Sequence, residues 1–133
     1  MEEDLRNLLD NASCKYSNFK VSAILETTKG IFKGVNVETA SYGATICAER
    51  SAITNAITNG CKKGDFKRLS IMNSSMKVAT PCFICRQLFV EFFNPDMPVI
   101  CYGIDGKYET YQVKDLCPYE FGEDNLWKQD LYQ

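Results

Sequence analysis

The apolar residues of the N-terminal third follow first a helical and then a strand-like period. Residues 2–12 place leucines at helical spacing among polar residues, which predicts an amphipathic helix. Residues 19–28 alternate in hydrophobicity, which predicts a strand that is buried on one face and partly on the other. The turn signal Lys29–Gly30 and the β-rich run 31–38 follow, so these segments are expected to form a hairpin.

A helical period returns after the break at residues 41–43. Isoleucines and alanines of residues 46–57 form one apolar side, and Asn59–Gly60 predicts the end of this helix. A short apolar run follows at residues 69–72 and fits a buried strand. Thr80 is then expected to cap a third helix, with proline at its first position and its end at Asn94–Pro95.

A second hairpin is predicted near the C-terminus. Residues 99–102 and 108–113 are strand-like and flank an Asp-Gly turn. The tail, residues 117–133, is only weakly periodic and is expected to pack on the domain or on a neighbouring subunit. Helices between strands, with a hairpin at each end, predict one α/β domain over residues 1–133, with a layered structure and a mixed sheet.

Composition and charge narrow the possible partners. The chain has 133 residues, is 45% hydrophobic and 24% charged, and carries a net charge of −2. No broad basic surface for a nucleic acid polymer is expected from this balance. No apolar run has the length of a membrane span, and the acidic N-terminus lacks the features of a signal peptide. The expected location is therefore the cytoplasm.

The chain contains seven cysteines and no histidine. An odd number of cysteines without a secretory signal favours reduced thiols and metal ligation over a disulfide framework. The absence of histidine excludes Ser-His-Asp triads, Cys-His proteases and mixed cysteine–histidine zinc sites. Any zinc ion must therefore be bound by thiolates, carboxylates or water.

Three cysteines lie at the predicted starts of two helices. Cys47 begins the second helix, and Cys82 and Cys85 begin the third with the spacing Pro-Cys-x-x-Cys. Helix N-termini stabilise thiolates, and three protein ligands leave a fourth zinc position for water. Glu49 lies two residues after Cys47, where it can exchange protons with that water. Arg50 can donate hydrogen bonds to the thiolates and reduce their charge.

A structural zinc site is the alternative explanation of these cysteines. In that case Cys61 or Cys101 would supply a fourth thiolate, and Glu49 would be an ordinary helix surface residue. The spacing favours the catalytic site, because both thiol groups lie at helix starts and a carboxylate follows the first. Cys14 and Cys117, like the two candidates for a fourth ligand, are expected to be small buried residues.

Several segments, in order along nearly the whole chain, resemble the small homotetrameric cytidine deaminases. These segments are residues 16–21, 34–42, 46–50, 81–87, 115–118 and 121–122. The resemblance implies a three-layer α-β-α sandwich, a homotetramer, and one Zn²⁺ per chain held by Cys47, Cys82 and Cys85. It also implies hydrolysis of cytidine and deoxycytidine to the uridines in pyrimidine salvage. Zinc-activated water would attack C4 of the base, and Glu49 would move protons to N3 and to the leaving amine.

The same resemblance assigns four substrate-binding residues within one chain. Asn36 and Glu38 match the pair that holds the ribose 3′-hydroxyl, and Phe19 matches an aromatic residue that packs against the base. Ala48 matches a further substrate-binding position. From the sequence alone, Phe19 would be a core residue, Asn36 a turn residue and Glu38 a surface charge.

Three more positions match residues that complete a pocket across a subunit boundary: Ala40, Tyr42 and Phe121. The chain also departs from the family pattern, because Phe83 and Ile84 stand where the family commonly has glycine and a small residue. These bulky residues leave the ligand spacing unchanged, so activity is expected, but they can alter access to the base or the fit to a neighbouring subunit.

Three alternatives remain open at this point. A deaminase of another aminopyrimidine nucleoside would share the zinc motif, although Asn36 and Glu38 favour an ordinary ribonucleoside. A polynucleotide cytosine deaminase would need a basic or aromatic groove, which the acidic composition does not favour. A structural zinc module without enzymatic activity is the third.

Overall fold

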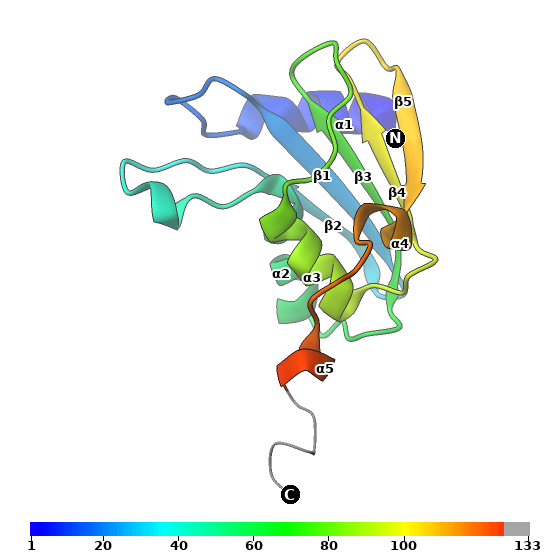
Figure 1. Ribbon diagram of the computed structural model, residues 1–133. Coiled ribbons are helices and arrows are strands. Elements are labelled where there is room, and N and C mark those ends of the chain that lie inside the picture. The colour runs from blue at the N-terminus through cyan, green and yellow to red at the C-terminus, as the bar shows by residue number, and fades with distance from the viewer. Residues whose placement is uncertain (127–133) are drawn as a thin grey trace, which may run out of the picture.

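The computed structural model describes residues 1–126, which build a five-stranded mixed sheet between helices (Figure 1). The strand order is β2-β1-β3-β4-β5; β3 and β4 are parallel and the other neighbours antiparallel. The strands are β1 (Val21–Thr27), β2 (Gly30–Val35), β3 (Phe66–Asn73), β4 (Pro98–Tyr102) and β5 (Tyr108–Gln112). Both predicted hairpins and the mixed sheet are confirmed.

Helices cover both faces of this sheet. In Figure 1, α1 lies behind the sheet, and α2 and α3 lie in front of it. The α-helices are α1 (Glu2–Leu8), α2 (Ala48–Thr58), α3 (Phe83–Phe92), α4 (Val113–Leu116) and α5 (Glu123–Leu126), and two 3₁₀ turns are Leu9–Asn11 and Tyr42–Ala44. This is the expected three-layer α-β-α arrangement.

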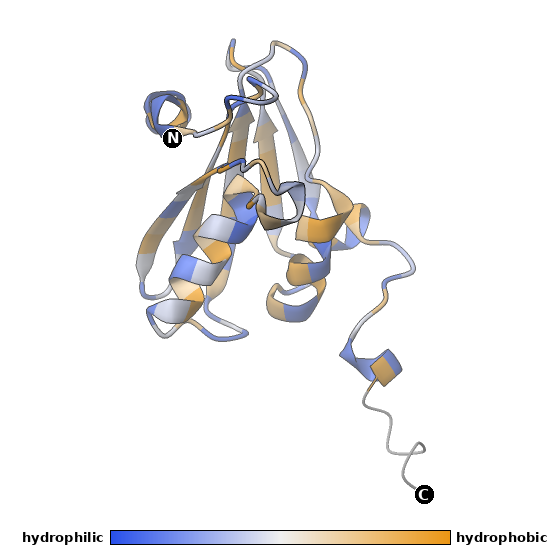
Figure 2. Cartoon of the chain, turned by 90° about the vertical axis from the view of Figure 1, so that its left-hand side faces the viewer, coloured by the Kyte–Doolittle hydropathy of each residue, from blue (hydrophilic) through white to orange (hydrophobic). Residues whose placement is uncertain are grey.

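Hydrophobic residues on the two faces of the sheet form two cores. Ala23 and Leu25 of β1 face the large core beneath α2 and α3, whereas Ile24 and Met72 pack with Leu5 of α1. Both faces of β1 are thus buried, which is more burial than the sequence predicts, because α1 covers the second face. Helices α1, α2 and α3 carry hydrophilic and hydrophobic residues in turn (Figure 2), and each presents an apolar side to the sheet.

The start of α3 differs from the prediction. Thr80 was expected as the N-cap and Pro81 as the first helical residue, but the helix begins at Phe83 and Cys82 is its N-cap. The hydroxyl of Thr80 instead accepts a hydrogen bond from Arg86 Nη2 at 2.9 Å. Cys82 keeps an extended backbone, with φ −66° and ψ 163°, so its side chain precedes the helix rather than lying within its first turn.

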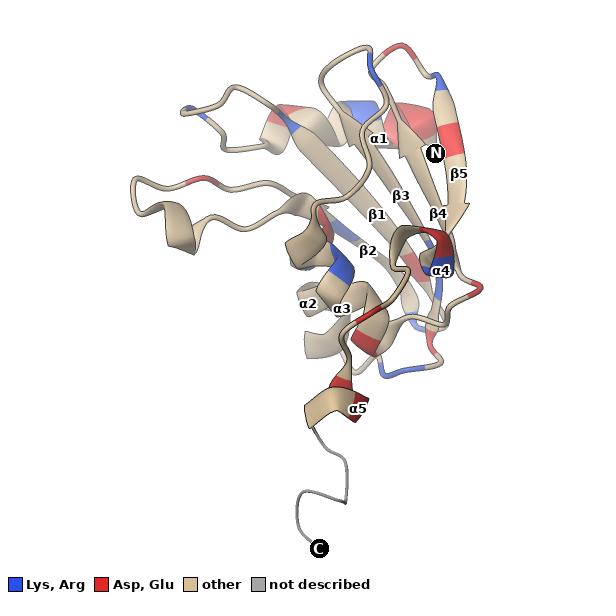
Figure 3. Cartoon of the chain, in the orientation of Figure 1, with Lys and Arg blue, Asp and Glu red and all other residues tan. Residues whose placement is uncertain are grey.

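Among residues 1–126, charged residues do not gather into a basic strip. Figure 3 shows Lys, Arg, Asp and Glu interspersed over strands, helices and loops. In the part of the chain that the structure describes, no helix is long and apolar enough to cross a membrane. The expected packing of the tail rests partly on Trp127 and Leu131, which lie outside the described residues.

Gly34 in β2 allows the first turns of α2 to lie against the sheet. A Cβ atom on Gly34 would lie 2.6 Å from the backbone nitrogen of Ala52 and would also overlap the carbonyl oxygen of Ala48. Both obstacles are backbone atoms, which cannot rotate away as a side chain can. The missing side chain therefore sets how closely α2 approaches β2, and with it the position of Cys47 at the helix start.

We expect Gly34→Ala to destabilise the fold by about 1–3 kcal/mol, the usual range for overpacking. Urea unfolding of the zinc-loaded protein measures this change. Gly43→Ala is the matched control, because a Cβ there meets no atom within 4 Å and the residue does not have a positive φ. Equal stability of the two variants would show that α2 can shift away from β2 without cost.

Candidate metal centre and adjoining pocket

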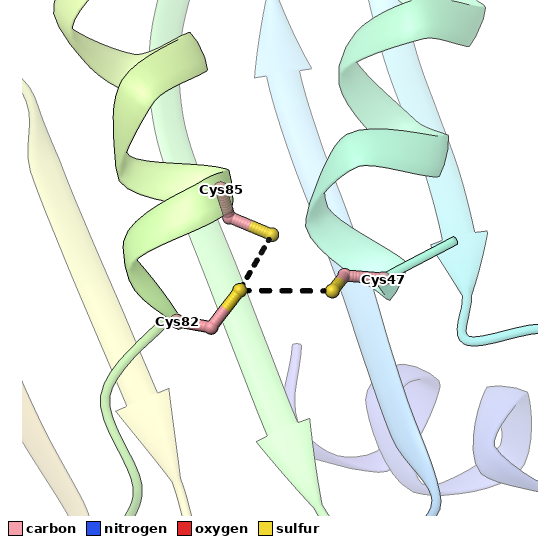
Figure 4. Close-up of side chains that lie close together, drawn as sticks. All are labelled: Cys47, Cys82 and Cys85. Atoms are coloured by element: carbon pink, nitrogen blue, oxygen red, sulfur yellow. Dashed lines mark hydrogen bonds between the residues drawn. The ribbon is translucent and has the colours of Figure 1, made fainter. Parts of the chain in front are cut away.

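Three cysteine sulfurs meet between the starts of α2 and α3 (Figure 4). Cys47 is the N-cap of α2 and Cys82 is the N-cap of α3, while Cys85 lies in the first turn of α3. Cys82 Sγ is 3.7 Å from Cys47 Sγ and 3.6 Å from Cys85 Sγ. The structure thus brings together the three residues that the sequence predicts as ligands.

The spacing of these sulfurs fits zinc. A tetrahedral ion with Zn–S bonds of about 2.3 Å separates neighbouring sulfurs by about 3.8 Å, close to the observed 3.6 and 3.7 Å. All three sulfurs lie within 4.8 Å of one another, and no other group of three potential metal ligands meets this criterion among residues 1–126. Three thiolates leave one tetrahedral position for a non-protein ligand, as in catalytic sites.

The pKa values of Cys47 and Cys85 are shifted in opposite directions. A hydrogen bond from Cys85, aided by Arg50, lowers the pKa of Cys47 to about 5. The pKa of Cys85 is raised in turn, because this thiol donates to the Cys47 thiolate and is buried. Placing a second and a third negative charge beside the first therefore requires a compensating cation, which is what a metal ion provides.

Arg50 supplies part of that compensation. Its Nη2 atom lies 3.4 Å from Cys47 Sγ and also donates to the carbonyl oxygen of Thr45 at 3.2 Å. The hydrogen bond to Cys47 raises the pKa of the guanidinium, so Arg50 remains charged. The contact stabilises Cys47 as a thiolate, the form that binds metal.

Glu49 lies in the first turn of α2, beside the sulfur cluster, and is only 5% exposed. Burial raises the pKa of its carboxyl group to about 7, and the negative charge of Cys47 contributes in the same direction. A pKa close to neutral suits a group that must both accept and release protons. The alternative in which Glu49 is a surface residue is therefore wrong.

A pocket of about 250 Å³ opens beside the cluster. Its lining contains seven of the residues that the sequence predicts for the metal site or the substrate, and these are Phe19, Asn36, Glu38, Cys47, Ala48, Glu49 and Cys82. Cys85, by contrast, is fully buried. The pocket therefore connects the sulfur cluster and a buried carboxylate with a chamber of small-molecule size.

Asn36 lies between this pocket and the start of β1. Its Nδ2 donates to the carbonyl oxygen of Phe19 at 2.8 Å, and its Oδ1 accepts from the backbone N–H of Val21 at 2.9 Å. An amide group has two N–H donors and two acceptor lone pairs. One donor and one acceptor of Asn36 therefore remain for a ligand, in addition to its role in the backbone of β1.

Glu38 holds the loop that precedes Phe19. One carboxylate oxygen accepts from the backbone N–H groups of Tyr16 and Ser17, and the other accepts from the Ser17 hydroxyl. The hydrogen bonds from Ser17 are the main cause of its lowered pKa. Since a carboxylate has about four acceptor positions, one position on Oε2 remains free.

Three predicted substrate residues lie away from this pocket in the single chain. Ala40 and Tyr42 are exposed on the long loop between β2 and α2, and Tyr42 is 78% exposed. Phe121 is 56% exposed and lies near α3, where its carbonyl oxygen accepts from Gln87. The structure thus separates these three residues from the predicted substrate residues that line the pocket, which are Phe19, Asn36, Glu38 and Ala48.

The remaining four cysteines do not join the metal cluster. Cys14, Cys61 and Cys101 are buried, Cys117 is half-buried, and none belongs to the three-sulfur group. Cys61 bonds the hydroxyl of Thr27, and Cys117 bonds the carbonyl oxygen of Arg86. Within residues 1–126, the site consists of three thiolates, so the four-thiolate structural alternative finds no fourth sulfur.

Sequence reasoning missed several pocket residues. The additional lining residues come from β1, β3 and the loops before α2 and α3, and they are Val21, Thr45, Ile71, Asn73, Ala79, Thr80 and Pro81. Asn73 reaches the pocket because the register of β1 and β3 places it opposite Val21. This pairing joins segments about fifty residues apart, so no local spacing could reveal it. Pro81, by contrast, precedes a predicted ligand and could have been included on that ground.

The family described as the cytidine and deoxycytidylate deaminase zinc-binding region matches residues 3–101. A probable cytidine deaminase of Dictyostelium discoideum is 40% identical, over 94% of this chain and 88% of its own length. A cytidine deaminase of Mycoplasma genitalium is 33% identical, over 86% of this chain and 87% of its own length.

Solved structures give the same result. A crystal structure of cytidine deaminase from Burkholderia pseudomallei superimposes with a TM-score of 0.84 at 36% sequence identity. The similarity covers 90% of this chain and 94% of that one, so it extends over most of the domain.

Proposed function

Because this chain belongs to the cytidine and deoxycytidylate deaminase family, we propose that it deaminates cytidine and deoxycytidine hydrolytically and releases ammonia. The cluster of Cys47, Cys82 and Cys85 is its zinc site. The observation that supports this function most strongly is the buried carboxylate of Glu49 beside the three sulfurs, at the inner wall of a pocket of about 250 Å³.

The proposed reaction replaces the exocyclic amine of the base by oxygen. When held by the three sulfurs, zinc would act as a Lewis acid that lowers the pKa of water. Glu49 accepts a proton from the attacking water and donates it to N3 as the bond between oxygen and C4 forms. Glu49 then transfers the remaining hydroxyl proton to the amine, the C4–N4 bond breaks, ammonia leaves, and Glu49 returns to the carboxylate.

Asn36 and Glu38 can together form hydrogen bonds with one hydroxyl group of the sugar. A hydroxyl group accepts and donates hydrogen bonds at the same time. The free N–H of Asn36 can donate to the ribose 3′-hydroxyl, which in turn donates to the free acceptor position of Glu38. Both side chains also shape the wall that presents Phe19, so substrate binding and pocket formation depend on the same residues.

A nucleoside fits this pocket better than a nucleotide. None of the described residues that line it is lysine or arginine, and Glu38 places a negative charge among them. A phosphate group would need a positive partner, which is usually a lysine or an arginine. This charge pattern favours cytidine over its 5′-phosphate, and it fits a role in pyrimidine salvage.

The exposed positions of Ala40, Tyr42 and Phe121 support a proposed homotetramer. Within one chain they lie outside the pocket that contains Glu49, so they can contact a substrate only in a neighbouring copy. Each copy would then supply these residues to another copy's pocket. A native mass measurement tests this assembly directly.

The decisive experiment measures the fall in cytidine absorbance as the purified, zinc-loaded protein converts cytidine to uridine. We expect turnover that stops on treatment with a chelator and returns on addition of zinc. Cytidine 5′-phosphate should react far more slowly than cytidine, and 3′-deoxycytidine should show a raised KM, since it lacks the hydroxyl for Asn36 and Glu38.

The absence of uridine from the zinc-loaded protein would disprove the proposed activity. A faster reaction with cytidine 5′-phosphate would replace the nucleoside by the nucleotide as substrate. An unchanged KM for 3′-deoxycytidine would leave the deaminase activity in place and remove the sugar-binding role of Asn36 and Glu38.

A further inference from the structure

Arg86 lies in the second turn of α3, and its side chain bonds the loop that leads into Cys82. Its Nε donates to the carbonyl oxygen of Pro81 at 2.7 Å, and its Nη2 donates to the hydroxyl of Thr80 at 2.9 Å. Its backbone N–H donates to the carbonyl oxygen of Cys82 at 3.1 Å. Arg86 thus bonds the carbonyl groups of Pro81 and Cys82. These two groups lie before and after the Cα atom of Cys82, which is a metal ligand.

The guanidinium also contacts the residue that follows Cys82. Its central carbon lies 4.3 Å from the centroid of the Phe83 ring, a distance at which a cation and an aromatic face attract each other. Phe83 is one of the two bulky residues inside the Cys-x-x-Cys spacing. Arg86 therefore restrains the chain both before and after Cys82.

A third branch of the guanidinium connects this loop with the C-terminal part of the domain. Arg86 Nη1 donates to the carbonyl oxygen of Leu116, the last residue of α4, at 2.8 Å. The thiol of Cys117 donates back to the carbonyl oxygen of Arg86 at 3.7 Å. The position of Cys82 is thereby coupled to a segment about thirty residues later in the chain.

We propose that Arg86 is a positioning residue that holds Cys82 in place for the metal. Cys82 needs such support because it precedes α3 with an extended backbone. The helix holds its carbonyl group through the backbone N–H of Arg86 but does not hold the chain on its N-terminal side. Arg50 acts differently, because its side chain contacts the sulfur atom of Cys47 directly. The described contacts of the Arg86 side chain are instead with oxygen atoms and with the Phe83 ring. Groups that orient metal ligands typically change metal affinity 10- to 100-fold when they are removed.

The test measures how fast the variants Arg86→Lys and Arg86→Gln release zinc to an excess of a chromogenic chelator, in comparison with the wild type. A lysine ammonium lacks the planar fork that reaches several acceptors at once, so both variants should release zinc faster, by roughly 10- to 100-fold for glutamine. The matched control is Arg68→Lys, which breaks a similar two-pronged contact with Glu26 at the strand pair β1–β3. The control should release zinc at the wild-type rate.

A purely structural role for Arg86 would have a different result. The melting temperature of the metal-free protein would fall while zinc release stayed at the wild-type rate, and that outcome would overturn the proposal. If the glutamine variant does not fold, the conservative lysine variant still decides the question. No substrate is used, so the result stands whether or not the chain deaminates cytidine.

Discussion

Replacement of Glu49 by glutamine should lower kcat for cytidine by roughly a hundred- to ten-thousand-fold, the range associated with loss of a general acid–base group. Glutamine retains the size of the side chain but cannot accept and release the proton that the reaction moves. Steady-state kinetics with cytidine, together with the measured zinc content, tests this expectation. One zinc ion should remain bound per chain, because the three sulfurs come from other residues.

The fold should tolerate this substitution. Glu49 is 5% exposed, and burial is the main reason that the pKa of its carboxyl group rises to about 7. An uncharged amide of the same shape avoids the cost of burying a charge, so the variant should melt at least as high as the wild type. Lost turnover in a stable, zinc-loaded protein would then reflect proton transfer alone.

Two outcomes would contradict the proposed role of Glu49, and one control variant helps to interpret them. Loss of zinc together with activity would indicate that Glu49 is a metal ligand, contrary to the proposed role. Activity close to that of the wild type would remove Glu49 from the reaction. Thr54→Ala serves as the matched control on α2, because Thr54 is exposed and bonds only carbonyl oxygens of its own helix; its kcat should equal that of the wild type.

The metal site could be predicted from sequence because its geometry is local. Two cysteines three residues apart at a helix start must lie close together, and the absence of histidine left sulfur as the main donor type. The pairing of Cys47 with these two required the fold, since α2 and α3 are separate elements on the same face of the sheet. The position of all three at helix starts suggested the grouping, and the family resemblance assigned the ligand set.

The start of α3 shows where local signals fail. Thr80 and Pro81 form a good helix-start signal, but the side chain of Arg86 bonds both residues from within the helix. The helix consequently begins two residues after Pro81, with Cys82 as its cap. A long side chain that folds back onto the preceding loop changes the boundary, and propensities of single residues do not contain that information.

The second roles of Asn36 and Glu38 were also beyond sequence reasoning. Both side chains bond backbone groups about twenty residues earlier in the chain. Such contacts depend on the isolated bridge between Ser13 and Val37, which brings the two loops together. The resemblance predicts these residues as substrate contacts, and the structure adds that their side chains hold the pocket wall in place.

Replacement of Cys85 by serine should reduce bound zinc from one ion per chain to a small fraction, with loss of cytidine turnover. The sulfur of Cys85 is fully buried and lies 3.6 Å from that of Cys82, so a serine oxygen, with a shorter bond and much weaker zinc affinity, cannot take its place. Metal analysis of the purified variant measures the occupancy.

Zinc binding should also be visible as folding stability in the wild type but not in this variant. A ligand that binds only the folded state adds about 2.7 kcal/mol to stability at a hundredfold excess over its Kd. Added zinc should therefore raise the melting temperature of metal-free wild-type protein and leave that of Cys85→Ser unchanged. This readout does not depend on cytidine.

Cys61→Ser provides the control that distinguishes a three-thiolate from a four-thiolate site. Cys61 is 3% exposed, and its thiol already bonds the hydroxyl of Thr27 at 3.5 Å, so serine can preserve that contact. We expect full zinc occupancy and a normal zinc-dependent rise in melting temperature. Loss of zinc from Cys61→Ser would mean that the domain rearranges to a four-thiolate site, which would leave no open position for water and would contradict the catalytic role.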